Sequence, residues 1–331
     1  MNYRRLGNSG LQVSELSLGS WLTFGKQISD DVAEELMKLA YDQGVNFFDN
    51  AEAYAGGQSE IVMGNILKKM NWPRSSFVVS SKVYFGADGG KGNLKPNQTG
   101  LSRKHVMEAC HEAMQRLQVD YLDLYFCHRP DKNTPIEETV RAMNTLIEQG
   151  KVLYWGTSEW SAQEITEAHL VARANNLIGP TMEQPQYNMF HRKRFEVEYK
   201  QLYKNVGMGT TIWSPLSSGV LTPKYIDQIP EGTRLDMKGM QWLKEAQLTE
   251  ERLEKVRDLN KIAKELDTTL PKLAVAWCLK NPHVSTVILG ASKVHQLKET
   301  LASGEVTPKL TEDVLERIEE ILDNKPEQPR W

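Results

Sequence analysis

The chain has 331 residues, of which 40% are hydrophobic and 25% charged, and its formal net charge at pH 7 is -3. This length and composition allow a large buried core and argue against a disordered chain. The longest apolar runs, such as VSTVILGA, are far shorter than the roughly 20 residues of a membrane-spanning helix, and no long basic run is present, so we expect neither membrane insertion nor a nucleic-acid partner.

The cysteines and the opening of the chain indicate a cytoplasmic protein. The three cysteines are Cys110, Cys127 and Cys278. An odd number without close spacing is typical of a reducing compartment and not of a disulfide scaffold. No basic, apolar leader opens the chain, so we expect a cytoplasmic location.

Apolar, β-rich runs alternate with helical patterns along the chain. The runs predicted as strands are residues 15–19, 46–50, 76–83, 121–128, 152–158, 181–188, 209–216 and 285–290. Helices with N-terminal caps are predicted at 29–44, 102–118 and 134–150, the first and third closing on glycine. Eight near-continuous apolar strands alternating with helices predict a closed parallel (β/α)8 TIM barrel in preference to an open sheet. No linker divides the chain, so residues 1–331 are expected to form a single domain.

Two further features are predicted around this barrel. The opening YRRLGNSGLQVSEL is typical of a β-hairpin that turns near residues 8–10 and covers the base of the barrel. Residues 84–100 and 215–242, after the third and seventh strands, are too long for ordinary barrel connections. Because both follow strands, we expect them on the catalytic face.

Polar residues stand at the ends of the predicted strands. In TIM barrels the C-terminal strand ends and the loops after them build the active site. The residues at these positions are Asp49, Tyr54, Lys82, His128, Ser158, Gln184, Trp213, Ser214 and Ser292. Since they come from different strands, they are expected to converge.

Asp49 and Lys82 are expected to neutralise one another, because a polar residue within an apolar strand carries a desolvation cost unless it is paired. A structural salt bridge is one interpretation of this pair. The other is chemical: an ammonium beside Tyr54 favours the phenolate, lowers the tyrosine pKa and makes Tyr54 a better proton donor. His128 would donate a hydrogen bond to the same oxygen. Together these groups would polarise a carbonyl for reduction by a hydride donor.

The motifs FFDNAEAY, SSKV, HRPD, WGTSEW, EQPQYN, WSPL and LGAS resemble the aldo-keto reductase superfamily over essentially the whole chain. The segments LGNSGLQVSELSLGSWLTFGKQIS, NTPIEETVRAMN and LPKLAVAWCLKN are similar to the potassium-channel beta-subunit branch and its soluble bacterial relatives. The resemblance implies NADPH-dependent reduction of an aldehyde or ketone on a (β/α)8 barrel. It implies that Asp49, Tyr54, Lys82 and His128 are the catalytic residues, with Tyr54 as the general acid.

The resemblance also implies a cofactor site. Trp213 matches the aromatic residue that stacks on the nicotinamide, and Ser158 and Gln184 match positions that hold its carboxamide. The other residues that it assigns to NADP(H) are Ser20, Trp21, Gln27, Asp49, Ser214, Pro215, Leu216, Ser218, Lys224, Arg234, Gly290, Ser292, Gln296 and Glu299. Ser292 is expected at a helix start, where free backbone N–H groups and the helix dipole favour an anion such as the 2′-phosphate.

The substrate pocket is expected to contain Tyr54 and His128. Trp21, Phe24 and Tyr84 are expected either to line this pocket or to pack in the core. Cys127 and His128 are neighbours on a strand and face opposite ways, so Cys127 is expected in the core. No histidine spacing indicates a metal site, and we expect none.

Two positions depart from the channel branch. His128 stands where that branch has an asparagine, which restores the general reductase pattern and favours turnover. Glu159 stands where it has an arginine, and this acid either faces away from the cofactor or tunes its affinity.

Two other functions stay open from the sequence. In a Schiff-base aldolase Lys82 would be a neutral nucleophile, although Asp49 argues for its charged form. A redox-sensing regulatory subunit would bind NADP(H) with little turnover. The channel branch also suggests a homotetramer, whereas many members of the superfamily are monomers.

Overall fold

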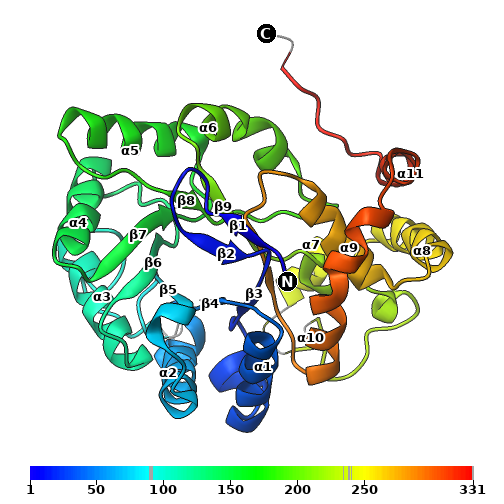
Figure 1. The fold of residues 1–331 in the computed structure, drawn as a ribbon, viewed down its shortest axis with the longest axis horizontal. Helices are drawn as coiled ribbons and strands as arrows, with labels where there is room; N and C mark the ends of the chain where they lie inside the picture. The colour runs from blue at the N-terminus through cyan, green and yellow to red at the C-terminus, as the bar shows by residue number, and fades with distance from the viewer. Residues whose placement is uncertain (89–91, 234, 238, 240, 330–331) are drawn as a thin grey trace.

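A computed structural model of the protein describes residues 1–88, 92–233, 235–237, 239 and 241–329. Among these residues, eight parallel strands close into a barrel in the order β10-β3-β4-β5-β6-β7-β8-β9 (Figure 1). Their bounds are β3 Leu16–Gly19, β4 Phe47–Asp49, β5 Val78–Val83, β6 Leu122–Cys127, β7 Val152–Thr157, β8 Met182–Glu183, β9 Gly209–Ile212 and β10 Thr286–Leu289. The predicted TIM barrel is confirmed.

The sixth and seventh strands are shorter than predicted. β8 and β9 end before Pro185 and Pro215, and proline has no backbone N–H to donate to a strand neighbour. A lone bridge between Gln186 and Trp213 continues their pairing. Ser214 then adopts a left-handed conformation (φ 57°), which turns the chain into the following loop.

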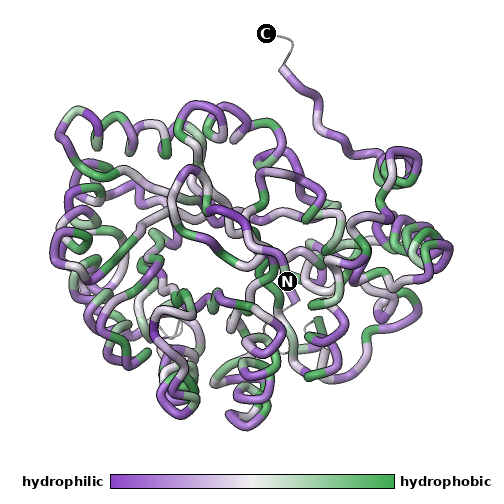
Figure 2. The backbone as a smooth tube through the Cα atoms, in the orientation of Figure 1, coloured by the Kyte–Doolittle hydropathy of each residue, from purple (hydrophilic) through white to green (hydrophobic). Residues whose placement is uncertain are grey.

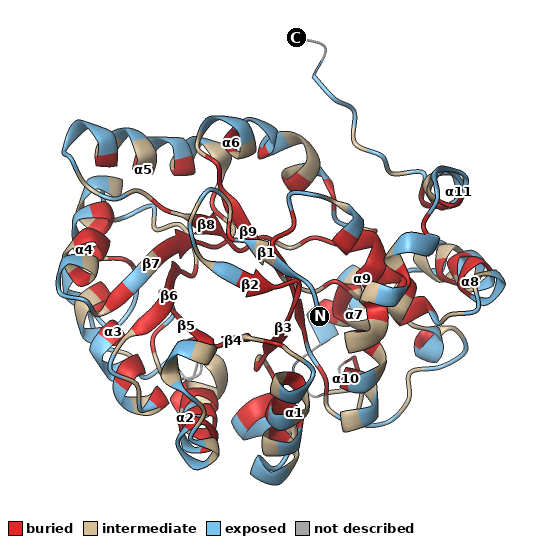
Figure 3. Cartoon of the chain, in the orientation of Figure 1, coloured by how far each residue is buried: buried red, intermediate tan, exposed pale blue. Residues whose placement is uncertain are grey.

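Helices surround the barrel and bury their inner faces (Figures 2 and 3). They are α1 Asp30–Asp42, α2 Gln58–Met70, α3 Arg103–Leu117, α4 Ile136–Glu148, α5 Ala162–Ala174, α6 Lys200–Asn205, α7 Gln241–Gln247, α8 Glu250–Glu265, α9 Leu270–Lys280, α10 Val294–Leu301 and α11 Glu312–Leu322. The three predicted helices are present as α1, α3 and α4. Ser29 and Ser102 cap the first two through their side chains, as expected for serine at an N-terminus. In the described part of the chain, no helix is long and apolar enough to cross a membrane.

The N-terminal hairpin covers the base of the barrel, as predicted. Strands β1 (Tyr3–Arg5) and β2 (Gln12–Ser14) pair antiparallel, and Figure 1 shows them lying across the barrel. Leu6 and Val13 are fully buried in a cluster whose other buried members come from barrel strands: Phe47, Val78, Leu124, Phe126, Met182 and Ile288. This cluster closes one end of the barrel and leaves its other end for polar groups.

The hairpin loop also contacts the segment that leads into β9. The backbone N–H of Asn8 donates to the carbonyl oxygen of Gly207 at 2.8 Å. Gly207 has a positive φ of 64°, and a Cβ there would lie 1.9 Å from the Asn8 side-chain nitrogen. Glycine is therefore required at this contact.

Strand alternation separates interior from exterior residues. Phe47 and Asp49 lie on one face of β4, and Val78, Ser80 and Lys82 on one face of β5, because successive side chains point to opposite sides of a strand. In each strand the apolar residue joins the hairpin cluster, and the polar residue lies toward the C-terminal end. Cys127 is buried in the outer core between strands and helices, as predicted.

The two long connections predicted after the third and seventh strands are present, and they lead to α3 and α7. Gly100 N–H donates to the Tyr84 carbonyl oxygen at 2.7 Å, which closes the base of the first connection. The second contains short 3-10 turns at Ser217–Gly219 and Pro223–Tyr225.

Candidate active site

A cavity of about 1220 Å³ opens at the C-terminal ends of the strands. It is lined by residues at or just after every barrel strand except β5, whose following loop contributes Phe85. The usual range for pockets that hold drug-sized ligands is about 300–1,000 Å³. This cavity therefore has room for an extended cofactor together with a small substrate.

A buried ion pair lies at the deep end of the cavity. The Lys82 ammonium is 2.7 Å from Asp49 Oδ2 and also donates to the Asn50 carbonyl oxygen at 2.7 Å. Asp49 Oδ1 accepts from the Ser80 hydroxyl at 2.8 Å and from the Gln184 amide at 3.0 Å. The side chains of Lys82 and Asp49 are 0% and 4% exposed, and these partners satisfy both charges as burial requires.

Tyr54 completes this arrangement from the loop after β4. The Lys82 ammonium donates to the Tyr54 hydroxyl oxygen at 3.2 Å. A 3-10 turn over Tyr54–Gly57 positions the phenol, with Ala55 at a positive φ of 50°. This backbone conformation is uncommon outside glycine and turns the chain directly after Tyr54.

The expected fall of the Tyr54 pKa was wrong in its net direction. Burial raises the Tyr54 pKa above 10.0, and the Lys82 charge lowers it by less than burial raises it. The ammonium therefore acts in the expected sense, but desolvation of the phenolate outweighs it. Tyr54 accordingly holds its proton at neutral pH and offers a neutral O–H donor.

Lys82 itself stays charged. Burial alone lowers its pKa, but attraction to Asp49 and to Tyr54 more than offsets burial, and the net pKa is raised above 10.5. A Schiff-base nucleophile must be a neutral amine. The aldolase hypothesis therefore loses its chemical basis.

His128 lies beside Tyr54 as a neutral imidazole. Its ring is T-shaped to the Tyr54 ring, with centroids 5.7 Å apart. Burial, followed by the charges of Lys82 and Arg129, holds the pKa of His128 well below 6.5. Its Nδ1 atom is buried and has no hydrogen-bond partner among the described residues, while the residue itself lines the cavity.

Trp213, at the end of β9, is held by Glu159. The indole N–H of Trp213 donates to Glu159 Oε1 at 3.0 Å, and the Gln186 backbone N–H donates to the same oxygen at 2.7 Å. Glu159 Oε2 pairs with Arg194 at 2.6 Å. Arg194 thus balances the charge of Glu159, and Glu159 fixes the edge of the Trp213 ring.

Ser158 and Gln184 are hydrogen-bonded to one another near Trp213 and the buried ion pair. The Ser158 hydroxyl donates to the Gln184 carbonyl oxygen at 2.9 Å. The Gln184 amide donates to Asp49 and, at 3.2 Å, to Thr211 Oγ1. Both residues line the cavity, so the Gln184 side chain links this region to the buried ion pair.

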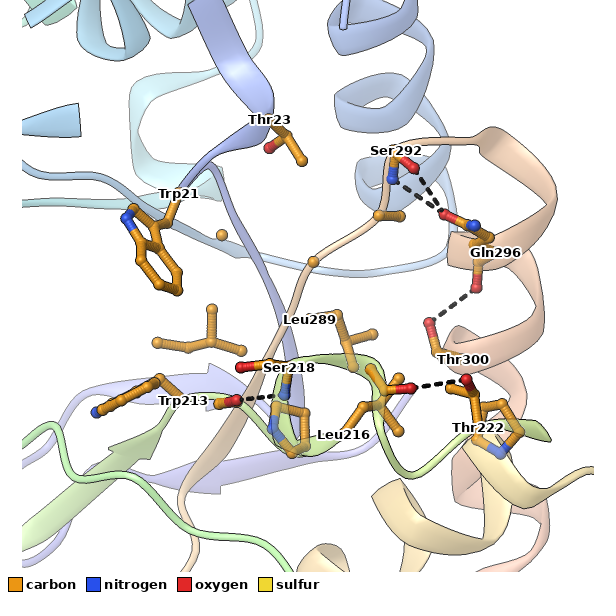
Figure 4. Close-up of a pocket in the computed structure, with 18 of the residues that line it drawn as sticks. Trp21, Thr23, Trp213, Leu216, Ser218, Thr222, Leu289, Ser292, Gln296 and Thr300 are labelled. Carbon is orange, nitrogen blue, oxygen red and sulfur yellow. Dashed lines mark hydrogen bonds between the residues drawn. The ribbon is translucent and has the colours of Figure 1, made fainter. Parts of the chain in front are cut away.

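Trp21 and Trp213 lie at one end of the view in Figure 4, and Ser292, Gln296 and Thr300 lie at the other. At the far end Gln296 Oε1 accepts from the Ser292 backbone N–H at 3.0 Å. Ser292 precedes helix α10, which begins at Val294. The Ser292 N–H was expected to be free for an anion, but it is already bound to Gln296. Lys224, Lys264 and Lys293 also line the cavity and make it suitable for anionic groups.

Most residues assigned from the sequence line this cavity. They are Trp21, Gln27, Asp49, Tyr54, His128, Ser158, Gln184, Trp213, Ser214, Pro215, Leu216, Ser218, Lys224, Gly290, Ser292, Gln296 and Glu299. Lys82 lies behind them and reaches the site through Tyr54 and Asp49. Arg234 lies outside the described residues.

Besides Lys82, three assigned residues of the described chain do not line it. Ser20 is fully buried, with its hydroxyl donating to the Asp49 carbonyl oxygen at 2.9 Å. Phe24 is buried in the hydrophobic core, and Tyr84 packs against that core, so for both the packing alternative holds. Phe85, Arg129 and Lys264 line the cavity and were not predicted.

Among the described residues, no group of three or more His, Cys, Asp or Glu side chains could hold a metal ion. The family model of the aldo/keto reductase family matches residues 15–323. This match spans the barrel and every residue that lines the cavity.

Proposed function

The chain belongs to the aldo/keto reductase family, oxidoreductases that act on carbonyl compounds with nicotinamide cofactors, and we propose that it reduces aldehydes or ketones with NADPH. The observation that carries this proposal is the contact of the Tyr54 hydroxyl with the Lys82 ammonium at 3.2 Å, beside a cavity of about 1220 Å³, which is large enough for a dinucleotide.

The residues present fit this cofactor. Trp213 offers an indole face, and Ser158 and Gln184 offer polar atoms where a carboxamide would lie. The lysines that line the cavity, Lys224, Lys264 and Lys293, would attract the phosphates of NADP(H), and this supports NADPH over NADH. When bound, the cofactor supplies the hydride.

The protein residues supply the proton and the polarisation. Tyr54 donates its proton to the carbonyl oxygen as negative charge develops there. Lys82 stabilises the resulting phenolate, and Asp49 holds the ammonium in place. Neutral His128 donates a hydrogen bond to the same oxygen and orients the carbonyl.

Consumption of NADPH in the presence of para-nitrobenzaldehyde or methylglyoxal tests the proposed reaction. We expect aldehyde-dependent oxidation of NADPH, measured by the loss of nicotinamide absorbance, and slower oxidation of NADH. Tight binding of NADPH without turnover of any aldehyde would instead favour a redox-sensing subunit.

The pH profile of kcat/KM tests the protonation states. The Tyr54 pKa is raised above 10.0 and the His128 pKa lies well below 6.5. A reaction that needs protonated Tyr54 and neutral His128 should be flat between these values, fall above pH 10 as Tyr54 loses its proton, and fall only well below pH 6.5 as His128 gains one. An inflection between pH 7 and 9 would assign the acid to another group.

We further propose that residues 1–331 act as one reductase unit in the cytoplasm and that it is related to the potassium-channel beta-subunit branch. The motifs described above support this relationship, and a homotetramer is its expected assembly. Light scattering of the purified protein measures that assembly.

A further inference from the structure

Arg129 adds a positive charge to the catalytic end of the cavity. It follows β6 directly after His128 and is half-buried. It lines the same cavity as Tyr54, His128 and Phe85. The guanidinium raises the cost of protonating His128 and thereby helps to lower the His128 pKa.

Neighbouring groups hold the guanidinium in one orientation. Arg129 Nη1 donates to the His128 carbonyl oxygen at 2.5 Å and to Ser158 Oγ at 3.4 Å. Its Cζ atom lies 5.8 Å from the centre of the Phe85 ring, and the Phe85 and His128 rings are 5.1 Å apart. These contacts occupy one nitrogen and leave most of the fork of N–H donors for a ligand.

The acidic residues near Arg129 are committed to other partners. Asp131, two positions along the chain, accepts from Leu101 N–H, Asn133 N–H and the Thr134 hydroxyl. Glu159 is bound to Arg194 and Trp213. Asp49 is bound to Lys82. None of the ion pairs within the described residues includes Arg129.

We propose that Arg129 recognises an anionic group of the substrate, so that the preferred carbonyl compounds are aldehydes or ketones that carry a carboxylate. A guanidinium binds a carboxylate through two parallel hydrogen bonds, and the Phe85 ring would shield this pair from water. The substrate then has its carbonyl at Tyr54 and His128 and its anion at Arg129. This inference rests on the proposed carbonyl reduction.

A pair of nearly isosteric substrates isolates the charge. Para-carboxybenzaldehyde is anionic and para-nitrobenzaldehyde is neutral. The ratio of their kcat/KM values in a variant, divided by the ratio in the wild type, cancels their different intrinsic reactivities. Because a hydrogen bond to a charged group contributes about 1.5–3 kcal/mol, Arg129→Met should lower this ratio roughly 10- to 100-fold.

Two further variants make the result specific. Arg129→Lys keeps the positive charge but lacks the two parallel N–H donors of the guanidinium, so it should retain part of the preference for para-carboxybenzaldehyde. Arg317→Met removes an exposed arginine on α11, paired with Glu265, and should leave the ratio unchanged. An unchanged ratio in Arg129→Met would overturn the inference, even if overall activity falls through a disturbed His128.

The cofactor is the other source of an anion for Arg129, and the affinity for NADPH separates the two. If Arg129→Met weakens NADPH binding and leaves the substrate ratio unchanged, the guanidinium serves the cofactor and the inference is wrong. Calorimetric binding of para-carboxybenzaldehyde to the complex with NADP+ measures the same preference without turnover. Absence of turnover would therefore refute the proposed reaction while this binding still tests Arg129.

Discussion

Replacing Tyr54 with phenylalanine should lower kcat for aldehyde reduction by at least roughly 100-fold, the usual effect of removing a general acid. The hydroxyl is the only part of the side chain that is removed. The ring keeps its place beside His128, and the residues proposed to bind the cofactor are untouched. NADPH affinity, measured by fluorescence titration, should therefore change little.

A second buried tyrosine provides the matched control. Tyr125 on β6 is fully buried and donates its hydroxyl to the Val106 carbonyl oxygen at 3.2 Å, outside the cavity. Tyr125→Phe removes the same atom from the barrel and should retain the wild-type kcat. Comparable turnover in Tyr54→Phe and Tyr125→Phe would show that Tyr54 is not the acid.

The barrel and the convergence at its C-terminal face could be predicted because they depend on local patterns. Asp49 and Lys82 are polar residues within apolar strands, and the cost of leaving them unpaired predicts their contact. Alternation along β4 and β5 then directs both side chains into the barrel. The observed distance of 2.7 Å agrees with this prediction.

The direction of the Tyr54 pKa could not be predicted, because it depends on how much of the phenol is buried. The sequence indicates a neighbouring ammonium but not the surrounding solvent. In the structure burial is the larger effect. A charge near a titratable group in a sequence therefore gives only one of the contributions to its pKa.

Phe85 was not predicted to line the cavity, because its position depends on Glu52, which is distant in the sequence. Strand alternation places Tyr84 on the Lys82 side of the chain, but β5 ends at Val83. The Glu52 carboxylate accepts from the backbone N–H groups of Tyr84 and Gly86, each at 2.8 Å. The chain turns around this carboxylate, and Phe85 lines the cavity in place of Tyr84.

The environment of Glu159 depends on a similar long-range contact. Its partner Arg194 is 35 positions away and lies outside any predicted strand end. No local pattern connects the two residues. The sequence therefore shows that Glu159 is an acid at this position, but its partner Arg194 can be identified only from the fold.

Replacing Lys82 with methionine should lower both the rate of aldehyde reduction and the free energy of unfolding. The phenolate left after proton donation would lose the ammonium at 3.2 Å that stabilises it, so kcat should fall by an amount comparable to that for Tyr54→Phe. Asp49 would remain as a buried charge without its cation, which typically costs about 3–5 kcal/mol of the free energy of unfolding. Denaturant titration and the aldehyde assay measure the two effects separately.

A double variant separates the two effects further. Asp49→Asn combined with Lys82→Met leaves no uncompensated charge and should recover part of the stability, but not the activity, because Tyr54 still lacks its ammonium. Asp123→Asn is the control for stability alone. Asp123 is buried, pairs with Arg74 at 2.6 Å and lies outside the cavity, so this variant should be less stable and yet fully active when folded. Recovery of turnover in the double variant would mean that the Asp49–Lys82 pair serves only the stability of the barrel.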